Sequence, residues 1–303
     1  MAMCALVLAS GCSGTTGTAE PARTKAAATT PGVGDCLEPM TGPLASGTRL
    51  PELVPCSQAH GGEVVSVHKL AASAAYPANS STIQGQDDAI KTCVDNSGGA
   101  GDFVSFAGDN RLTVPPAERT STGVSQAWAV SGVDPAVYVP GPAAWARGER
   151  WIACAAVLNN SLSAPASYSG TLRGARAKPG KLEPALAWCK LQPNAGTPRD
   201  FRSLSCTTAH NYEQLASFSA GDQKAAFPGD AALNQLATTL CAPLSSAATG
   251  GRSDTAGAAY GLSWSWPQAG EWSQGDRVVR CFVATSTGNT IGTIGSGTAA
   301  PAR

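Results

Sequence analysis

The sequence predicts an α+β fold made of two tandem small domains, each a short antiparallel sheet with one main helix, stapled by disulfides. Two observations predict it. The two halves of the chain carry the same motifs in the same order, which indicates an internal repeat. Eight of the ten cysteines divide evenly between the halves, and 303 residues are enough for two ordinary domains.

The composition indicates the cellular compartment of the protein and excludes one class of partner. Ten cysteines are many for a cytosolic protein, where thiols stay reduced, so we expect an oxidising compartment outside the cytoplasm. The formal net charge is zero and the basic residues do not alternate with aromatic ones, so we expect no nucleic-acid partner. Because only 14% of the residues are charged, surface ion pairs are not expected to stabilise the units.

The N-terminus predicts export and anchoring. An apolar run over residues 4–9 has about the length of a signal-peptide core and is too short to span a bilayer. It leads into Ser10-Gly11-Cys12, an ending that resembles a bacterial lipobox. We therefore predict a signal peptide over residues 1–11 and lipidation of Cys12, which would anchor the chain at the extracytoplasmic face of the plasma membrane. Residues 12–32 are mostly small or polar and predict a flexible tether. The alternative is a buried apolar N-terminal strand.

Two motifs define the repeat. C-x-x-A-H-x-x-E runs from Cys56 to Glu63 and from Cys206 to Glu213, and W-x-x-G-[DE]-R-x-x-x-C ends at Cys154 and at Cys281. The predicted organisation is a first domain over residues 33–174, a linker over 175–184, a second domain over 185–298 and a tail over 299–303. The first unit carries an insertion between Cys93 and Cys154, in the stretches around residues 96–102 and 116–123, which we expect to be an expanded surface loop.

The same elements are expected in both units. A strand should follow each histidine motif, a helix should come next, and a last strand should carry the fourth cysteine. For the first and second unit in turn, the predicted strands are 63–67 and 213–218, then 151–157 and 278–284. The helix is predicted over about 82–93 in the first unit. In the second unit it should begin near Asp230, as its cap, and end at Cys241.

The cysteines predict two disulfides in each unit. They are Cys36, Cys56, Cys93 and Cys154 in the first unit and Cys189, Cys206, Cys241 and Cys281 in the second. Four cysteines allow three pairings, and the sequence does not choose among them. Each disulfide should contribute on the order of 3 kcal/mol in the chain-entropy description.

The candidate chemical residues are His60 with Glu63, and His210 with Glu213. In an extended segment, positions i and i+3 point to opposite sides, so we do not expect either pair to bind a metal. We expect each histidine to fix a turn by a hydrogen bond to backbone beside a disulfide. Metal binding or acid–base chemistry is the alternative.

The sequence holds no nucleophile elbow, P-loop, dinucleotide-binding glycine motif or H-E-x-x-H motif. Each domain cysteine also has a counterpart in the other unit, which argues against a free catalytic thiol. We therefore predict no enzyme activity, no catalytic residues, no cofactor and no metal.

The second motif predicts a tight turn that enters the last strand. Gly148 and Gly275 should adopt a positive φ, the acidic residue should pair with the arginine, and the tryptophan should pack on the nearby disulfide. The residues concerned are Trp145 and Arg150 in the first unit and Trp272 and Arg277 in the second. Alternatively, these tryptophans could join Trp264 and Trp266 in an aromatic surface for glycan or protein ligands.

Together, these signatures resemble the septum formation domain of high-GC Gram-positive bacteria. The resemblance is carried by Gly34-Asp35-Cys36-Leu37 and by the two repeated motifs, and it extends as two copies from Val33 to the C-terminus. Departures are Ala59 and Ala209, where proline is usual before the histidine.

The resemblance implies an envelope-associated domain linked to cell division, and it transfers no catalytic residues. We expect a non-enzymatic, lipid-anchored binding or scaffolding protein. Its partners would be the membrane, through the anchor, and envelope or division proteins or cell-wall glycan. The alternatives are an envelope hydrolase acting through His60 or His210 and a carrier of lipid or glycan.

Overall fold

The computed structural model describes residues 30–39, 50–76, 93, 101–158, 167–176, 183–191, 202–249, 260–285, 290–293 and 300–301. The predicted signal peptide, Cys12 and most of the predicted tether lie outside these residues. The predicted first-unit helix also lies outside them, except for Cys93, which is helical. None of the described helices is long and apolar enough to cross a membrane.

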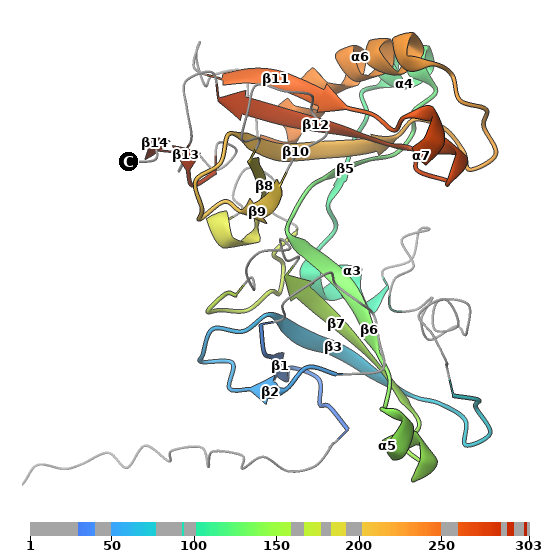
Figure 1. Ribbon diagram of the computed structural model, residues 1–303, viewed down its shortest axis with the longest axis vertical. Coiled ribbons are helices and arrows are strands. Elements are labelled where there is room, and N and C mark those ends of the chain that lie inside the picture. The colour runs from blue at the N-terminus through green and yellow to red at the C-terminus, as the bar shows by residue number, and fades with distance from the viewer. Residues whose placement is uncertain are drawn as a thin grey trace, which may run out of the picture.

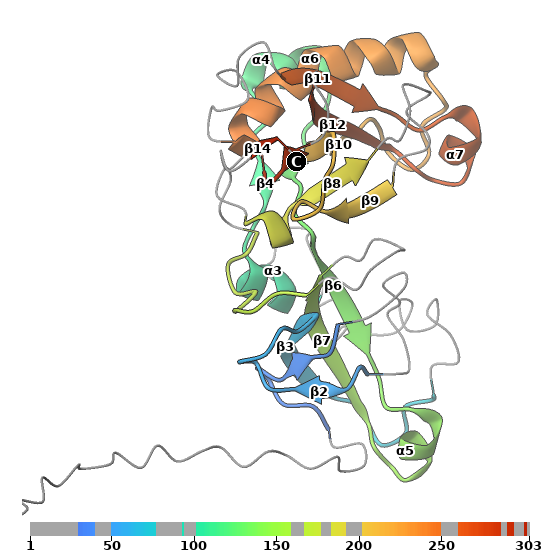
Figure 2. The same cartoon turned by 60° about the vertical axis from the view of Figure 1, so that its left-hand side comes forward.

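The fold is α+β, as predicted, with two antiparallel sheets that carry most of the described chain (Figures 1 and 2). The first sheet has the strand order β2-β1-β3-β7-β6. Its strands are β1 (Cys36–Leu37), β2 (Leu53–Val54), β3 (Gly62–Lys69), β6 (Val133–Tyr138) and β7 (Trp151–Leu158), and α5 (Pro142–Ala146) connects the last two. Strand β7 is buried at every position, as expected for an uninterrupted apolar run in the middle of a sheet.

Helix α3 (Asp102–Ala107) covers one face of the first sheet. It buries Phe103 and Phe106 in a cluster that includes Ile152 and the Cys93–Cys154 disulfide. The His68 Nε2 atom lies 2.7 Å from Oδ2 of Asp102, which ties strand β3 to the first turn of this helix.

The second sheet has the order β11-β12-β10-β5-β4, and β8 and β9 extend from β10. The strands are β4 (Arg111–Leu112), β5 (Ala127–Ala129), β8 (Trp188–Leu191), β9 (Arg202–Ser205), β10 (Tyr212–Ser219), β11 (Tyr260–Ser265) and β12 (Val278–Thr285). The helices are α4 (Pro116–Thr122), α6 (Asp230–Thr249), α7 (Ala269–Ser273) and the short 3-10 helix η1 (Pro184–Leu186). Strands β13 (Thr290–Ile291) and β14 (Ala300–Pro301) pair separately, so part of the predicted tail is a strand.

Helix α6 begins at Asp230 and buries an apolar stripe against the second sheet. The predicted end at Cys241 is wrong, because the helix continues through Pro243 to Thr249. Leu244 and Ala248 continue the same stripe and are buried. Their burial favours helix beyond the point where proline removes a backbone hydrogen bond.

The prediction of a surface loop is wrong for the stretch around residues 116–123, which forms helix α4, and residues 94–100 lie outside the described ranges. The surrounding segment over residues 102–129 also forms α3, β4 and β5, and β5 adds to strand β10 of the second sheet over Ala216–Phe218. Its apolar residues enter the core beneath α6, namely Leu112, Val114, Val124, Ala127 and Ala129. The second sheet therefore contains strands from within the predicted first domain.

The first residues of the predicted linker also pack against the core of the first sheet. Leu172 and Ala175 are buried in the core of the first sheet, and the backbone N–H of Arg176 donates to the carbonyl of Ala107 at 2.7 Å. The Arg176 guanidinium lies 4.9 Å from the Phe103 ring centroid. Residues 175 and 176 thus belong to the first unit, and residues 177–182 lie outside the described ranges.

Each half contains two disulfides, as predicted, and consecutive cysteines pair. The bonds are Cys36–Cys56, Cys93–Cys154, Cys189–Cys206 and Cys241–Cys281. In each unit the first disulfide fixes the loop before the histidine motif, and the second fixes a helix to the last strand.

We expect the double substitution C36A/C56A to lower the free energy of unfolding by about 3 kcal/mol, because the disulfide restricts the unfolded chain across a sequence separation of 20 residues. Urea unfolding of the oxidised protein, followed by circular dichroism, would measure this loss. The exposed neighbour Ser57→Ala is the control. A double variant as stable as this control would contradict the prediction.

Candidate functional site

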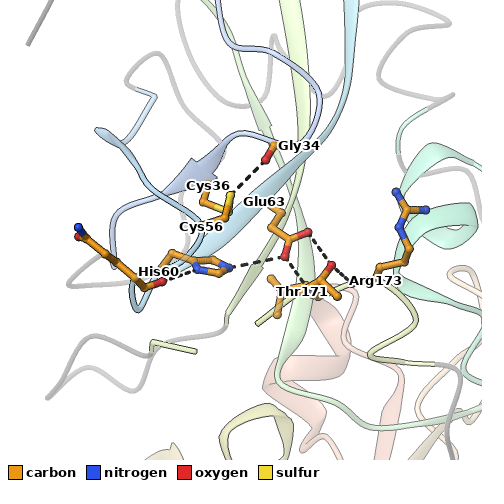
Figure 3. Close-up of a disulfide and its surroundings, with 9 residues drawn as sticks. Gly34, Cys36, Cys56, His60, Glu63, Thr171 and Arg173 are labelled. Carbon is orange, nitrogen blue, oxygen red and sulfur yellow. Dashed lines mark hydrogen bonds and ion pairs between the residues drawn. A yellow bond between two sulfur atoms is a disulfide. The ribbon is translucent and has the colours of Figure 1, made fainter. Parts of the chain in front are cut away.

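His60 is fully buried and lies two residues before strand β3 (Figure 3). Its Nδ1 lies 2.9 Å from the carbonyl oxygen of Gln58, and its Nε2 lies 3.6 Å from Oε1 of Glu63. Its backbone forms a two-way bridge with Tyr168, with both N···O distances at 3.0 Å. The histidine therefore fixes its own turn to a segment more than a hundred residues away, and the predicted bond to backbone is confirmed.

The prediction that His60 and Glu63 point to opposite sides is wrong. The chain bends at Gly61 and the strand begins only at Gly62, so the alternation of a strand does not extend back to His60. A Cβ at Gly61 would lie 2.7 Å from Cα of Pro39, and one at Gly62 would lie 2.8 Å from the carbonyl oxygen of Ala156. The two glycines allow the close backbone approach that brings the side chains together.

The Glu63 carboxylate anchors the distant segment. Its Oε1 accepts the backbone N–H of Leu172 at 2.8 Å, and its Oε2 accepts the hydroxyl of Thr171 at 3.1 Å. The Thr171 oxygen in turn accepts the backbone N–H of Arg173 (Figure 3). Glu63 is only 6% exposed, so its carboxylate oxygens accept hydrogen bonds from the protein and have little contact with solvent.

The second unit repeats the contact between the histidine ring and a backbone carbonyl at His210. This residue is also fully buried, and its Nδ1 lies 2.8 Å from the carbonyl oxygen of Thr208. Burial lowers the pKa of His210, and the bond to Thr208 opposes that shift, so the ring is neutral at pH 7. Glu213 and Thr293 are also buried. The backbone N–H of Gly292 donates to the carbonyl of Cys206.

Each histidine lies beside a disulfide in a group that resembles a metal site. The potential ligand atoms of Cys36, His60 and Glu63 lie within 4.8 Å of one another, and so do those of Cys189, Cys206 and His210. All of these cysteines are in disulfides, and only a thiolate is a strong metal ligand. In the oxidised protein the two groups therefore do not fit a metal, and they serve to hold loops.

We expect Glu63→Leu to lower the free energy of unfolding by about 2 kcal/mol, because it leaves the Leu172 N–H and the Thr171 hydroxyl without their acceptor. Urea unfolding would measure it, with Glu52→Gln, an exposed carboxylate of the same unit, as the control. Equal stabilities for the two variants would show that the Glu63 contacts do not stabilise the unit.

The tryptophans of the second motif are buried, which favours packing over ligand binding. Trp145 is 6% exposed and Trp272 is 4% exposed. The Arg150 guanidinium lies 4.3 Å from the Trp145 ring centroid, and that of Arg277 lies 4.0 Å from the Trp272 centroid. The turn glycines have the predicted positive φ, 96° at position 148 and 98° at position 275.

The predicted pairing of arginine with the acidic side chain is wrong. Arg150 and Arg277 donate instead to backbone carbonyls, including that of the stacked tryptophan, at 2.6 and 2.5 Å. The acidic side chains pair with other arginines, Glu149 with Arg147 and Asp276 with Arg280. Stacking on the ring holds the guanidinium flat, which aims its N–H groups at the carbonyls of the turn.

Trp264 and Trp266 are partly buried against the α6 helix. Their indole N–H groups donate to Asn234 and Asp230, each at 2.9 Å. These tryptophans therefore fasten β11 and the residue after it to α6.

Lys190, which no sequence motif marks, lies on β8 beside an aromatic ring. Its Nζ lies 5.1 Å from the Phe282 ring centroid. Burial, and then the charge of Arg280, lower the pKa of Lys190 to about 8. A comparison of the two repeats could have identified this lysine. The residue after the first cysteine is the apolar Leu37 in the first unit and the charged Lys190 in the second.

We expect Lys190→Leu to raise the free energy of unfolding by about 1–3 kcal/mol at pH 7. Below pH 8 the folded protein bears the full cost of the charged ammonium. Between pH 8 and 10.5 the unfolded chain binds more protons, so the wild type gains stability as pH rises and the difference shrinks. Urea unfolding at pH 7 and pH 10 would measure it, and a difference that grows with pH would contradict it.

The septum formation family matches residues 118–289, more than half of the chain. The chain belongs to the septum formation family. The match runs from within α4 to the residues after β12, and so it contains the second sheet from β5 onwards together with β6 and β7. No curated protein and no solved structure matches the chain. Family membership links the protein to cell division, and the disulfides are compatible with a place in the cell envelope.

Proposed function

We propose that this protein is a non-enzymatic, lipid-anchored envelope protein that binds or scaffolds components of the division septum. Family membership supports the link to septum formation. The four disulfides support an oxidising compartment, and the predicted lipobox at Cys12 supplies the anchor. In this proposal the chain carries two copies of the family domain, which share the order of their paired strands.

The proposal that the protein is not an enzyme is supported by the burial of both histidines. His60 and His210 have no exposed surface, and each is bound to a backbone carbonyl. A general acid or base must come within hydrogen-bond reach of its substrate, and these rings are enclosed by their own loops. The residues that look catalytic in the sequence are better explained as supports for the fold.

The proposal is tested by replacing the chromosomal gene with Cys12→Ala. We expect the variant protein to leave the membrane fraction and septa to be misplaced or delayed, while Cys4→Ala behaves as wild type. Crosslinking in living cells, followed by mass spectrometry, should capture envelope or division components with the wild type. Normal septation and unchanged membrane association in Cys12→Ala would overturn the anchoring.

Two further variants test whether the histidines take part in catalysis. We expect His60→Gln and His210→Gln, where they remain folded, to complement the deletion because a glutamine amide can still bond to the turn carbonyl. A folded variant that binds its envelope partners and yet fails to complement would instead favour the hydrolase alternative.

A further inference from the structure

The Cys36–Cys56 disulfide differs from the other three disulfides in its exposure. Cys36 is buried, but Cys56 lies in an exposed turn after strand β2. The six cysteines of the other disulfides are all 0% exposed. Disulfide exchange requires a thiolate to reach one of the two sulfur atoms. In the folded protein a reductant can therefore attack this disulfide more readily than the others.

Three potential ligand atoms meet beside this disulfide (Figure 3). The sulfur of Cys36, a ring nitrogen of His60 and a carboxylate oxygen of Glu63 lie within 4.8 Å of one another. All three residues are buried. Thiolate sulfur, imidazole nitrogen and carboxylate oxygen are the donor types that bind zinc in proteins. Reduction of the disulfide would turn the sulfur into a thiolate and so complete the set of donors.

The His60 ring presents a lone pair to this group. Its Nδ1 lies 2.9 Å from the Gln58 carbonyl oxygen, which can only accept, so the neutral ring has its proton at Nδ1 and its lone pair at Nε2. Nε2 is buried and has no hydrogen-bond partner among the described residues. It faces Oε1 of Glu63 at 3.6 Å, which is too long for a hydrogen bond. A cation between the two atoms would satisfy both of them.

Hydrogen bonds hold both side chains in the way that zinc ligands are usually held. In metal sites the second ring nitrogen of a histidine donates to a carbonyl or carboxylate, and ligating carboxylates are themselves hydrogen-bonded. His60 Nδ1 has this contact with Gln58, and the Glu63 carboxylate accepts from Thr171 and Leu172. Each carboxylate oxygen has a further lone pair, so these bonds leave Glu63 able to bind a metal ion.

The spacing of the atoms is close to that of a tetrahedral zinc site. With zinc–ligand bonds of about 2.0–2.3 Å, two tetrahedral ligands lie about 3.3–3.8 Å apart. The distance of 3.6 Å between His60 Nε2 and Glu63 Oε1 is within this range. The Cys36 sulfur needs to move by no more than about 1 Å. Cys56 lies in a turn outside the sheet, so it can move apart from Cys36 without breaking strand pairing.

We propose that reduction of the first disulfide creates a zinc site made of Cys36, Cys56, His60 and Glu63. Two thiolates, one imidazole and one carboxylate make a four-coordinate set of the kind found in closed, structural zinc sites. The zinc ion holds the loop before β3 in place of the disulfide, so the first unit stays folded in both redox states. The inference goes beyond the proposed function and does not rest on it.

The reductant is a dithiol, such as the reduced active site of a thiol–disulfide oxidoreductase. One of its thiolates attacks the exposed sulfur of Cys56, and Cys36 leaves as a thiolate. The second thiol of the reductant displaces Cys56 and completes the reductant's own disulfide, so two electrons and two protons pass to the cysteines. Zn²⁺ then binds both thiolates and releases those two protons to solvent.

The second unit provides an internal comparison. The potential ligand atoms of Cys189, Cys206 and His210 also lie within 4.8 Å of one another. Both cysteines are fully buried, so a reductant does not reach them while the unit is folded. We therefore expect the Cys189–Cys206 disulfide to persist under conditions that open Cys36–Cys56, and zinc to bind in the first unit.

The test uses the full-length chain with Cys4→Ala and Cys12→Ala, which removes the two cysteines outside the repeat. Mild treatment with dithiothreitol, followed by alkylation and peptide mass spectrometry, should label Cys36 and Cys56 before any other cysteine. Calorimetric titration of the reduced chain should show about one Zn²⁺ bound. We expect that affinity to be at least about a hundredfold higher than in the oxidised chain, because only a thiolate is a strong ligand.

Variants locate the zinc ion at this cluster. We expect His60→Gln and Glu63→Gln each to weaken zinc binding by the reduced chain at least about tenfold. His68→Gln is the matched control, since His68 lies in the same unit and pairs with Asp102 outside the cluster. Thermal unfolding identifies a variant that fails to fold. In that case X-ray absorption at the zinc edge of the reduced chain without the variant remains informative, with two sulfur neighbours and two nitrogen or oxygen neighbours expected.

Four outcomes would overturn the inference. They are first reduction of another disulfide, no zinc binding by the reduced chain, equal binding by the oxidised chain, and unchanged affinity in a folded His60→Gln variant. A zinc edge spectrum without sulfur neighbours would also overturn it. Because zinc binding is measured on the purified chain, its failure would leave the proposed role at the septum standing.

Discussion

Arg277→Met should lower the free energy of unfolding by about 3–5 kcal/mol, because it removes the hydrogen bonds of a buried guanidinium to five backbone carbonyls. Arg277 is 5% exposed. It donates to the backbone carbonyls of Trp272, Asp276, Asp222, Gln223 and Ala225. The arginine thus joins the turn before β12 to the segment that precedes α6, and methionine keeps the packing on Trp272 without those bonds.

Arg150→Met is the matched comparison, and we expect it to cost about 1–2 kcal/mol. Arg150 stacks on Trp145 in the same way, but within the described part of the chain its guanidinium donates to two carbonyls, those of Trp145 and Glu149. Arg277→Lys should not restore stability, because an ammonium cannot match the planar fork of donors. Urea unfolding of the three variants measures the differences, and equal losses at positions 150 and 277 would show that stacking and not hydrogen bonding dominates.

Much of each sheet was predictable because its signals are local. The β-branched and apolar runs that became β3, β7, β10 and β12 have the length and position expected from the sequence. The positive φ at Gly148 and Gly275 follows from the turn that each must make. The division of the disulfides between the halves followed from the repeat, while the choice among three pairings needed the fold.

The errors concern contacts between distant segments. The apolar residues on either side of α4, such as Val114 and Val124, are scattered among polar ones and show no strand or helix period. Their burial depends on a partner sheet that comes more than eighty residues later. His60 and Glu63 meet because two glycines bend the chain, and Glu63 then binds Thr171 in a segment that the sequence does not mark as its neighbour.

The family match is consistent with this picture of the second sheet. It begins at residue 118, before β5 and well before the predicted second domain at residue 185. The matched region therefore includes the strand that completes the open side of β10, together with β6 and β7 from the first sheet. A boundary drawn between the two sets of cysteines separates β10 from a strand that it needs.

A fragment of residues 183–303 should therefore fail to fold cooperatively, although it carries both disulfides of its unit. It lacks Leu112, Val114, Val124, Ala127 and Ala129, which are buried in the core beneath α6. Burial of the three larger side chains alone is worth about 5 kcal/mol, and a small domain is stable by only about 5–15 kcal/mol. The fragment would also expose the edge of β10 over Ala216–Phe218, where it is prone to associate with other strands.

Addition of a peptide of residues 109–131 should restore the fold, since it supplies β4, α4 and β5 without any covalent link. Circular dichroism during urea titration, with and without the peptide, measures the recovery. A peptide with Ala127→Asp is the control, because Ala127 is 1% exposed and pairs with Phe218, so a buried carboxylate there should abolish the rescue. Cooperative unfolding of the fragment alone, unchanged by either peptide, would mean that the second unit is independent and that the added strand contributes nothing to its stability.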